Sequence, residues 1–168
     1  MTKRVLAKQI TEAADIDQNI RSKVKSGKGV LNMLYYLIDQ LHYFRIHDWI
    51  KKHGYPTQKM IGKDAMHGFW LLIMHQYQDK TLQKACSKYC DFSSADAATL
   101  TDRLRIGEGK KQIFGTHLKR TDNNTRLEPH PIKDPRNVDK RRKKVGLGLL
   151  AKHIQEEMND LKKRKILK

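Results

Sequence analysis

The longest run of consecutive apolar residues lies near the middle of the chain, within residues 62–83. Residues 69–74 are apolar at six successive positions. A helix with one face in water has an apolar stripe instead, so this run predicts a helix that is buried on all sides. Asp64 can cap its beginning. We expect this helix to form the centre of the fold.

Helical spacing of apolar residues continues on both sides of this run. The spacing is loose in 2–25 and regular, at three and four positions, in 30–52, where His53-Gly54 ends the pattern. Further helices are expected at 81–89, continuous with the central helix or kinked near Asp79, and from a serine cap at about 93 to 104. A final helix is expected to start from a cap at Asn137 or Asp139 and to contain the basic run that begins at Arg141.

One small β-hairpin is predicted near residues 113–128. Two short segments, 113–119 and 125–128, flank Asp122-Asn123-Asn124, which favours a tight turn. The predicted fold class is therefore mainly α, a compact bundle of about five to six helices around a buried central helix with this one hairpin.

The best candidate for a linker is Ser26-Gly27-Lys28-Gly29, which interrupts the helical pattern. We therefore expect an N-terminal basic helical extension at 1–29, a single helical domain at 30–160 and a basic tail at 161–168. A chain of 168 residues is long enough for one domain with a real core.

The chain is strongly basic, with 35 Lys and Arg residues against 18 Asp and Glu, for a net charge of +17. Residues 1–29 carry +4 and residues 139–168 carry +7, so the ends are more basic than the body. This charge indicates a partner with phosphates, either an anionic small molecule or nucleic acid. Solvated basic tails are an equally good interpretation, because lysine predominates and is the less specific phosphate ligand.

No membrane association is expected. The first ten residues lack the apolar segment of a signal peptide, and no stretch has the ~18 to 20 apolar residues of a membrane span. Cys86 and Cys90 are four apart on a predicted helix, which suits a shared helix face better than a disulfide. We expect a cytoplasmic protein.

His75 is the main candidate for chemistry. It ends the apolar run, and Asp79 follows one turn later, where its carboxylate can orient the imidazole. A histidine titrates near neutral pH, so His75 can act as a general acid or base. Asp39 and His42, three apart on the preceding helix, supply further polar groups.

Seven short strings occur in the order and spacing of one family. They are DQLH (39–42), HGYP followed by IG (53–62), WLLIMH (70–75), LTDR (100–103), QIFGT (112–116), PIKDP (131–135) and VDKRRKKVGL (138–147). In these the chain resembles the bacterial family catalogued as domain of unknown function 6624, over about residues 37–153. The resemblance implies no established reaction.

The chain departs from this family at four positions. Relatives usually have Gln where Met74 stands and an acid where Tyr77 stands. They also tend to have Asn in place of His42 and Gln in place of His117. If the missing acid takes part in the chemistry, Asp79 or His117 is its substitute here, or activity has been lost.

The strings contain polar residues suited to a site. Asp102 can orient His75, arginines can grip a phosphate or carboxylate in bidentate fashion, and Gly115-Thr116 can bring backbone N–H groups to a ligand. We expect His75, Asp102 and Asp79 to be catalytic. We expect the substrate to be bound by Arg103, Gln112, Thr116, His117, Arg141, Arg142, Asp39 and His42. The alternative is a buried polar network that only joins helices to the hairpin.

Three functions follow from these features. The first is a small cytosolic enzyme, a hydrolase or transferase, acting on an anionic or phosphorylated substrate. The second is a nucleic-acid-binding module that uses the basic termini, and the third is an interaction protein whose N-terminal helix docks a partner. We expect no metal and no cofactor, because there is no CxxC pair, no HExxH string and no phosphate-binding glycine loop.

Overall fold

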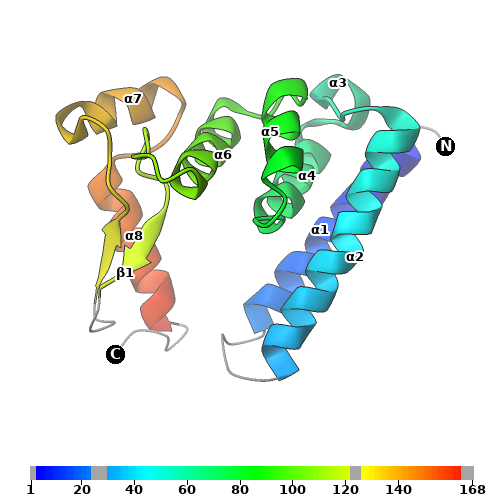
Figure 1. The fold of residues 1–168 in the computed structure, drawn as a ribbon, viewed down its shortest axis with the longest axis horizontal. Coiled ribbons are helices and arrows are strands. Elements are labelled where there is room, and N and C mark those ends of the chain that lie inside the picture. Colours follow the sequence, from blue (N-terminus) through cyan, green and yellow to red (C-terminus); the bar gives the residue numbers. More distant parts are fainter. Residues whose placement is uncertain (1–2, 24–29, 122–125, 164–168) are drawn as a thin grey trace. The chain divides into compact units, whose positions relative to one another are not determined.

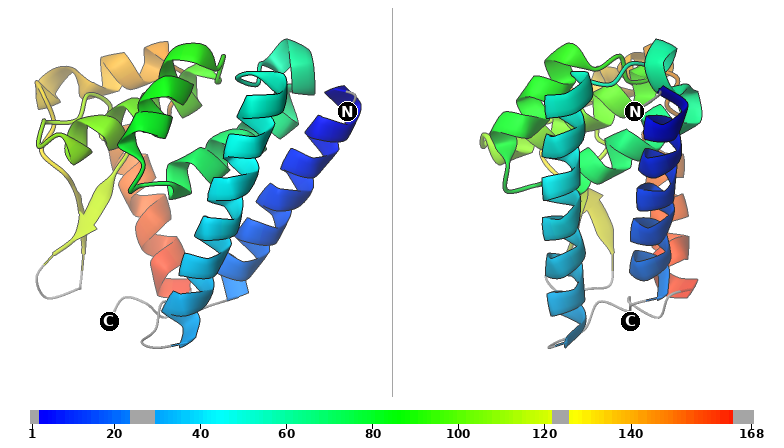
Figure 2. Two further views of the ribbon diagram at one scale, coloured as in Figure 1. Left: turned by 45° about the vertical axis from the view of Figure 1, so that its right-hand side comes forward. Right: turned by 90° about the vertical axis from the view of Figure 1, so that its right-hand side faces the viewer.

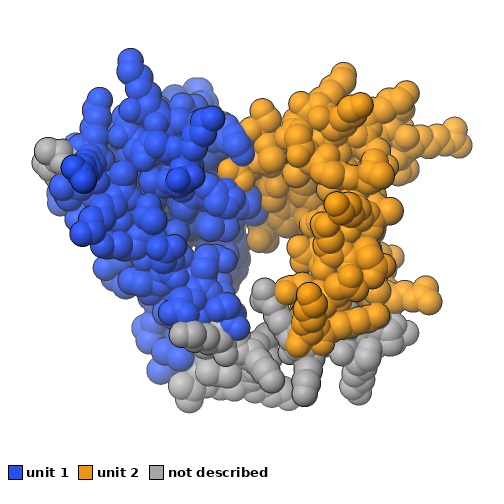
Figure 3. All heavy atoms as spheres, turned by 180° about the vertical axis from the view of Figure 1, so that it is seen from behind, with its two compact units in different colours: residues 1–93 blue, residues 94–168 orange. Residues whose placement is uncertain are grey.

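The chain is mainly helical, as the hydrophobic pattern predicts (Figure 1). The computed structural model describes residues 3–23, 30–121 and 126–163. These residues form eight α-helices, one 3-10 helix and a two-stranded antiparallel sheet. The chain divides into two compact units, Met1–Ser93 and Ser94–Lys168, which Figure 3 colours separately. This division falls inside the segment 30–160 that the sequence predicted to be one domain.

The first unit is built on three helices that pack against one another. α1 and α2 lie side by side and run in opposite directions, and α4 packs against both (Figure 2). Seven of the thirteen residues of α4 are buried, although Trp70 and Leu71 are only half covered. The elements of this unit are α1 (Lys3–Lys23), α2 (Val30–His53), α3 (Gln58–Ile61), α4 (Lys63–His75) and α5 (Lys80–Tyr89).

α1 is part of the core of the first unit, not the appendage that the sequence suggested. Its side chains Leu6, Ile10 and Ala13 are buried. A Cβ added at Gly68 of α4 would lie 3.1 Å from the Cβ of Ala14, so the glycine permits the two helices to approach closely. The loose apolar spacing of α1 is thus sufficient to form a buried stripe.

The predicted central helix over 62–83 is broken into two helices. α4 ends at His75, and α5 begins at Lys80, where the side chain of Asp79 accepts a hydrogen bond of 2.8 Å from the Leu82 N–H. Aspartate is a favoured N-cap, so Asp79 begins a new helix instead of continuing the old one. At the other end, Gly62 is the N-cap of α4 and Asp64 lies in its first turn.

The second unit combines helices with the hairpin. Leu118 pairs with Pro129 and Arg120 with Leu127 in the antiparallel sheet. The hairpin is therefore confirmed, while its predicted turn at 122–124 lies outside the described residues. The elements of this unit are α6 (Ser94–Gly107), β1 (Leu118–Arg120), β2 (Leu127–Pro129), the 3-10 helix η1 (Pro135–Asn137), α7 (Val138–Lys144) and α8 (Leu150–Lys163).

The predicted final helix is also two helices. α7 and α8 are separated at Gly146, which has a φ of +76° that side-chain-bearing residues rarely adopt. Asp139, one of the two predicted caps, accepts a 2.8 Å hydrogen bond from the Leu150 N–H and so caps α8.

Gly115 gives a test of packing in the second unit. It has a φ of +66°, and an added Cβ would lie 2.9 Å from Ile132 Cδ1 and 3.0 Å from Leu150 Cδ1. Gly109 has a φ of +71° and no atom within 4 Å of such a Cβ. We expect Gly109→Ala to lower the free energy of unfolding by about 1 kcal/mol and Gly115→Ala by about 2 to 3 kcal/mol in urea denaturation. Equal losses would show that Ile132 and Leu150 make room without cost.

Candidate functional site

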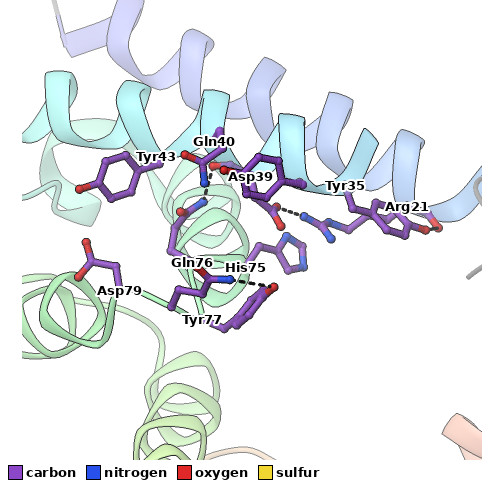
Figure 4. Close-up of a pocket in the computed structure, with 11 residues that line it drawn as sticks. Arg21, Tyr35, Asp39, Gln40, Tyr43, His75, Gln76, Tyr77 and Asp79 are labelled. Carbon is purple, nitrogen blue, oxygen red and sulfur yellow. Dashed lines mark hydrogen bonds and ion pairs between the residues drawn. The ribbon is translucent and has the colours of Figure 1, made fainter. Parts of the chain in front are cut away.

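A cavity of about 530 Å³ opens on the first unit (Figure 4). α1, α2 and the turn between α4 and α5 supply its lining. The volume is within the range of pockets that hold small molecules. The lining includes the charged or titratable residues Arg21, Asp39, His75 and Asp79, together with the tyrosines Tyr35, Tyr36, Tyr43 and Tyr77.

His75 is paired with a carboxylate that the sequence reasoning did not identify. Its Nδ1 lies 2.9 Å from Oδ2 of Asp17, whose side chain has an exposed fraction of 0%. Asp17 continues the buried stripe of α1, and the end of α4 places the imidazole beside it. The angle at Nδ1 does not meet the requirements of a hydrogen bond among the described residues, so the pair is a close contact with a carboxylate. A carboxylate at this distance still favours the tautomer with its hydrogen on Nδ1, which leaves Nε2 to accept a proton.

Arg21 joins α1 to α2 through two carboxylates. It lies one turn after Asp17, and its Nε is 3.0 and 3.1 Å from the two oxygens of Asp17. Its Nη2 donates to Oδ1 of Asp39 on α2, the pair marked in Figure 4. The guanidinium also lies over the ring of Tyr35, 5.2 Å from its centroid. One arginine thus compensates two carboxylates beside His75.

These surroundings shift the pKa values of Asp17 and Asp39 in opposite directions. Burial alone raises the pKa of Asp17, but hydrogen bonding and charge from His75 and Arg21 outweigh it, so this pKa lies below 3.8. The pKa of Asp39 is raised, because burial outweighs the attraction of Arg21 and His75. Asp17 is therefore the group that stays ionised beside the imidazole.

His42 lies behind the cavity and not in its lining. Its side chain is 1% exposed, and its Nε2 is 3.9 Å from Oδ1 of Asp17. In the part of the chain that the structure describes, neither ring nitrogen has a hydrogen-bond partner. Burial lowers the pKa of His42 to about 4, so the ring is neutral near pH 7. His42 was predicted to bind substrate. Its side chain instead lies beside Asp17 and does not line the cavity.

Asp79 does not orient His75 in the way that the helical spacing predicted. Its Oδ1 caps α5, and its Oδ2 lies 3.5 Å from Nε2 of His47. The reason is the break after His75, which removes the one-turn relation on which the prediction depended. Asp79 nevertheless lines the same cavity.

Asp102, the other predicted orienting group, belongs to the second unit and organises a loop there. Its carboxylate is fully buried and accepts backbone hydrogen bonds from Ile113 at 2.5 Å, Phe114 at 3.0 Å and Thr116 at 3.1 Å. The Thr116 hydroxyl donates a further bond of 3.0 Å. The carboxylate of Asp102 thus accepts five contacts, two of which come from the N–H of Phe114. These contacts fill its acceptor positions.

Gln112 bonds to the chain on both sides of the hairpin. Its amide donates to the carbonyls of His117 at 3.1 Å and His130 at 2.8 Å. Its Oε1 accepts from the His117 N–H at 3.1 Å. These bonds join the start of the hairpin to its end, which is a structural task.

The two predicted anion-gripping arginines also bond to backbone. Arg141 donates to the carbonyls of Ile113 at 2.8 Å and Lys133 at 2.7 Å. Arg142 is buried and donates to the carbonyls of Gly148 at 2.5 Å and Phe114 at 2.8 Å. Because their N–H groups are used inside the unit, these side chains do not form a free clamp.

Arg103 and His117 complete the polar network of the second unit. The Nε of Arg103 is buried without a hydrogen-bond partner among the described residues, and burial lowers the pKa of this guanidinium. Burial, followed by the positive charge of Arg103, lowers the pKa of His117 to about 3. His117 Nδ1 lies 3.0 Å from the Thr116 hydroxyl. This arrangement favours the alternative of a buried network that joins helices to the hairpin.

The cluster of Asp17, Asp39 and His75 in the first unit can also be compared with a binding site for a divalent cation. Asp17, Asp39 and His75 each place one ligand atom within 4.8 Å of the others. Arg21 bonds to both carboxylates, so a cation would compete with a guanidinium that already balances them. The donor set therefore fits an acid–base pair with its own counter-charge better than a metal site.

Asp17 and Arg21 are the residues that sequence reasoning missed. Apolar residues of α1 recur at Leu6, Ile10 and Ala13, and the next position of that stripe is Asp17. A charged residue in register with a buried stripe, with an opposite charge four residues later, was the available indication.

A protein-family model of a family of unknown function (DUF6624) matches residues 3–165. The chain belongs to this family. The match extends beyond residues 37–153 and includes α1 with Asp17 and Arg21. Neither the curated proteins nor the solved structures contained a match to the chain.

None of the helices in the described residues combines the length and apolar character needed to cross a lipid bilayer.

The buried histidines predict acid sensitivity. Unfolded His42 binds a proton below pH 6.5, whereas folded His42 binds one only near pH 4. Stability should therefore fall as the pH is lowered from 6.5 to 4, by up to about 3 kcal/mol for a depression of this size. His117 acts in the same direction. When the free energy of unfolding is measured by urea denaturation at several pH values, it should fall less steeply with decreasing pH for His42→Asn than for wild type. His67→Asn, at an exposed position, should show the same pH dependence as wild type. The same pH dependence in all three proteins would contradict the lowered pKa of His42.

Proposed function

We propose that the protein is an enzyme, a hydrolase or transferase, with its active site in the cavity of the first unit. His75 is the general acid and base, and Asp17 is the positioning residue behind it. The observation that carries the proposal is the 2.9 Å contact between Nδ1 of His75, which lines an open cavity, and the fully buried carboxylate of Asp17. A histidine with only a structural role has no need of an open cavity beside it.

The arrangement supports proton transfer in both directions. With its hydrogen on Nδ1, the ring accepts a proton from water or a substrate hydroxyl at Nε2, and the attacking oxygen becomes more nucleophilic. Asp17 stabilises the imidazolium that forms, without itself taking the proton. The imidazolium then returns the proton to the leaving group, so His75 ends in its starting state.

Arg21 and Asp39 have a supporting part in this proposal. Arg21 holds Asp17 in place through both carboxylate oxygens and connects it to Asp39 on α2. The anionic substrate expected from the sequence depended largely on Arg103, Arg141 and Arg142. Because Arg141 and Arg142 bond to carbonyls, an anion clamp is not part of the proposal. We place the enzyme in the cytoplasm, where free thiols such as Cys86 and Cys90 persist.

His75→Asn tests the proposal, because asparagine keeps a hydrogen-bond donor for Asp17 but cannot transfer a proton. Wild type should turn over at least one member of a panel of chromogenic esters, amides, phosphoesters and glycosides. We expect His75→Asn to lower kcat about 100-fold or more with the melting temperature within a few degrees of wild type. His67→Asn, on an exposed position of the same helix, should keep wild-type kcat.

Turnover that survives His75→Asn would remove His75 from the chemistry. A panel with no turnover, together with failure of diethyl pyrocarbonate to modify His75 in the folded protein, would also count against the proposal. In that case the ring is sealed and its role is structural.

Nucleic-acid binding is a second candidate, favoured by the net charge of +17. Three exposed lysines lie within the short helix α7, at positions 140, 143 and 144. Phosphate contacts release counterions, so affinity for a labelled oligonucleotide should fall at least about tenfold between 50 and 200 mM salt in fluorescence anisotropy. A flat response would exclude this candidate. The third candidate, docking of a partner by the N-terminal helix, loses its basis because the apolar stripe of α1 is already buried.

A further inference from the structure

We propose that the cavity of the first unit takes an organic cation that carries a ring, such as an arylalkyl amine or a quaternary ammonium compound. This inference rests on the proposed function, since it names the substrate class of the same site. It depends on the charge and the aromatic content of the lining, and neither was used to assign His75.

The lining is acidic in a protein that is otherwise strongly basic. The lining contains two carboxylates, Asp39 and Asp79, and one guanidinium, Arg21, so carboxylates exceed fixed positive charges in the lining by one. Asp17 adds a further carboxylate directly behind the wall. Arg21 is shared between Asp17 and Asp39, which leaves little of its charge for a ligand. The whole chain has a net charge of +17, so the sign of this cavity is a local property.

Four tyrosines surround these carboxylates. Tyr36 and Tyr77 line the cavity and are 57% and 56% exposed, so much of their surface is left uncovered and accessible to a ligand. The face of an aromatic ring attracts cations, and acceptors of quaternary ammonium groups are built from several such rings. Tyr35 already has a cation over its ring, the guanidinium of Arg21 at 5.2 Å. The lining therefore offers both attractive surfaces that an organic cation uses, ring faces and carboxylates.

The polar groups between the tyrosines suit the same ligand. Asp79 comes from the turn after α4 and Asp39 from α2, so carboxylates lie on more than one side of the cavity. An anionic ligand would meet both of them and find one arginine that is already bonded twice. A ring with a positive charge avoids this repulsion, and its reacting bond can approach His75 in the same lining.

Three probes of similar size and different charge test the inference: benzylamine, benzyl alcohol and benzoate at pH 7.5. Each is titrated into the full-length protein, and binding is followed by NMR shifts of the cavity residues. We expect benzylamine to bind tightest, benzyl alcohol at least about fivefold more weakly, and benzoate not at all. Asp79→Asn keeps a favourable N-cap but removes a lining charge, and should weaken benzylamine binding about two- to fivefold. Tyr36→Ala should do the same.

Matched controls are available outside the lining. Asp48→Asn removes an exposed charge from α2, and Tyr89→Ala removes a tyrosine that is 51% exposed on α5. Neither should change benzylamine binding. Benzoate binding as tight as benzylamine, benzylamine binding that ignores Asp79→Asn and Tyr36→Ala, or no binding of any probe would each overturn the inference.

The outcome is separable from that of the proposed function. Selective benzylamine binding together with unchanged turnover in His75→Asn would leave the cation site and remove the acid–base role. Loss of turnover in His75→Asn without selective binding of the cation would leave the enzyme and remove the substrate class.

Discussion

The first unit depends on the burial of one carboxylate. Asp17 has no exposed surface, and an isolated ionised carboxylate in such a place costs far more free energy than a small unit can supply. Arg21 and His75 offset that cost, one from the same helix and one from α4. Arg21 also reaches Asp39 on α2, so three helices meet at a single charge. The apolar contacts among α1, α2 and α4 are non-directional, whereas this cluster requires one relative placement of the helices.

The second unit uses a carboxylate in a different way. Asp102 is also fully buried, but its acceptor positions are filled by backbone N–H groups of the loop before the hairpin and by the Thr116 hydroxyl. Such a group fixes a loop and has no capacity left for a ligand. Asp17 instead contacts an imidazole that lines a cavity. The partners of each carboxylate, and not its depth of burial, separate a structural group from a candidate catalytic one.

Much of the fold was predictable from apolar periodicity, and the site was predictable only in part. The helices α1 and α2 are close to their predicted ranges, and the hairpin is present, although its first strand is Leu118–Arg120 where 113–119 was predicted. The break at Gly146 was missed, and the break at Asp79 was expected at most as a kink, because both residues act through capping and backbone conformation, which leave little trace in the hydrophobic pattern. His75 was identified from an interrupted apolar run. Its partner was not, because Asp17 is 58 residues away along the chain and only the packing of α1 on α4 brings the two together.

The close approach of α1 to α4 at Gly68 has a consequence for how the chain can be shortened. A fragment that starts at α2 would lose Asp17 and Arg21 and, with them, the helix whose Ile10 and Ala14 pack against α4 at Gly68. The remaining helices would then expose an apolar surface, and the carboxylate of Asp39 would lose its arginine partner. Exposed apolar surface promotes self-association. The amino-terminal helix therefore both packs on the interior of the first unit and supplies Asp17 and Arg21 to the cluster around His75, so a shortened chain that keeps this cluster has to include α1.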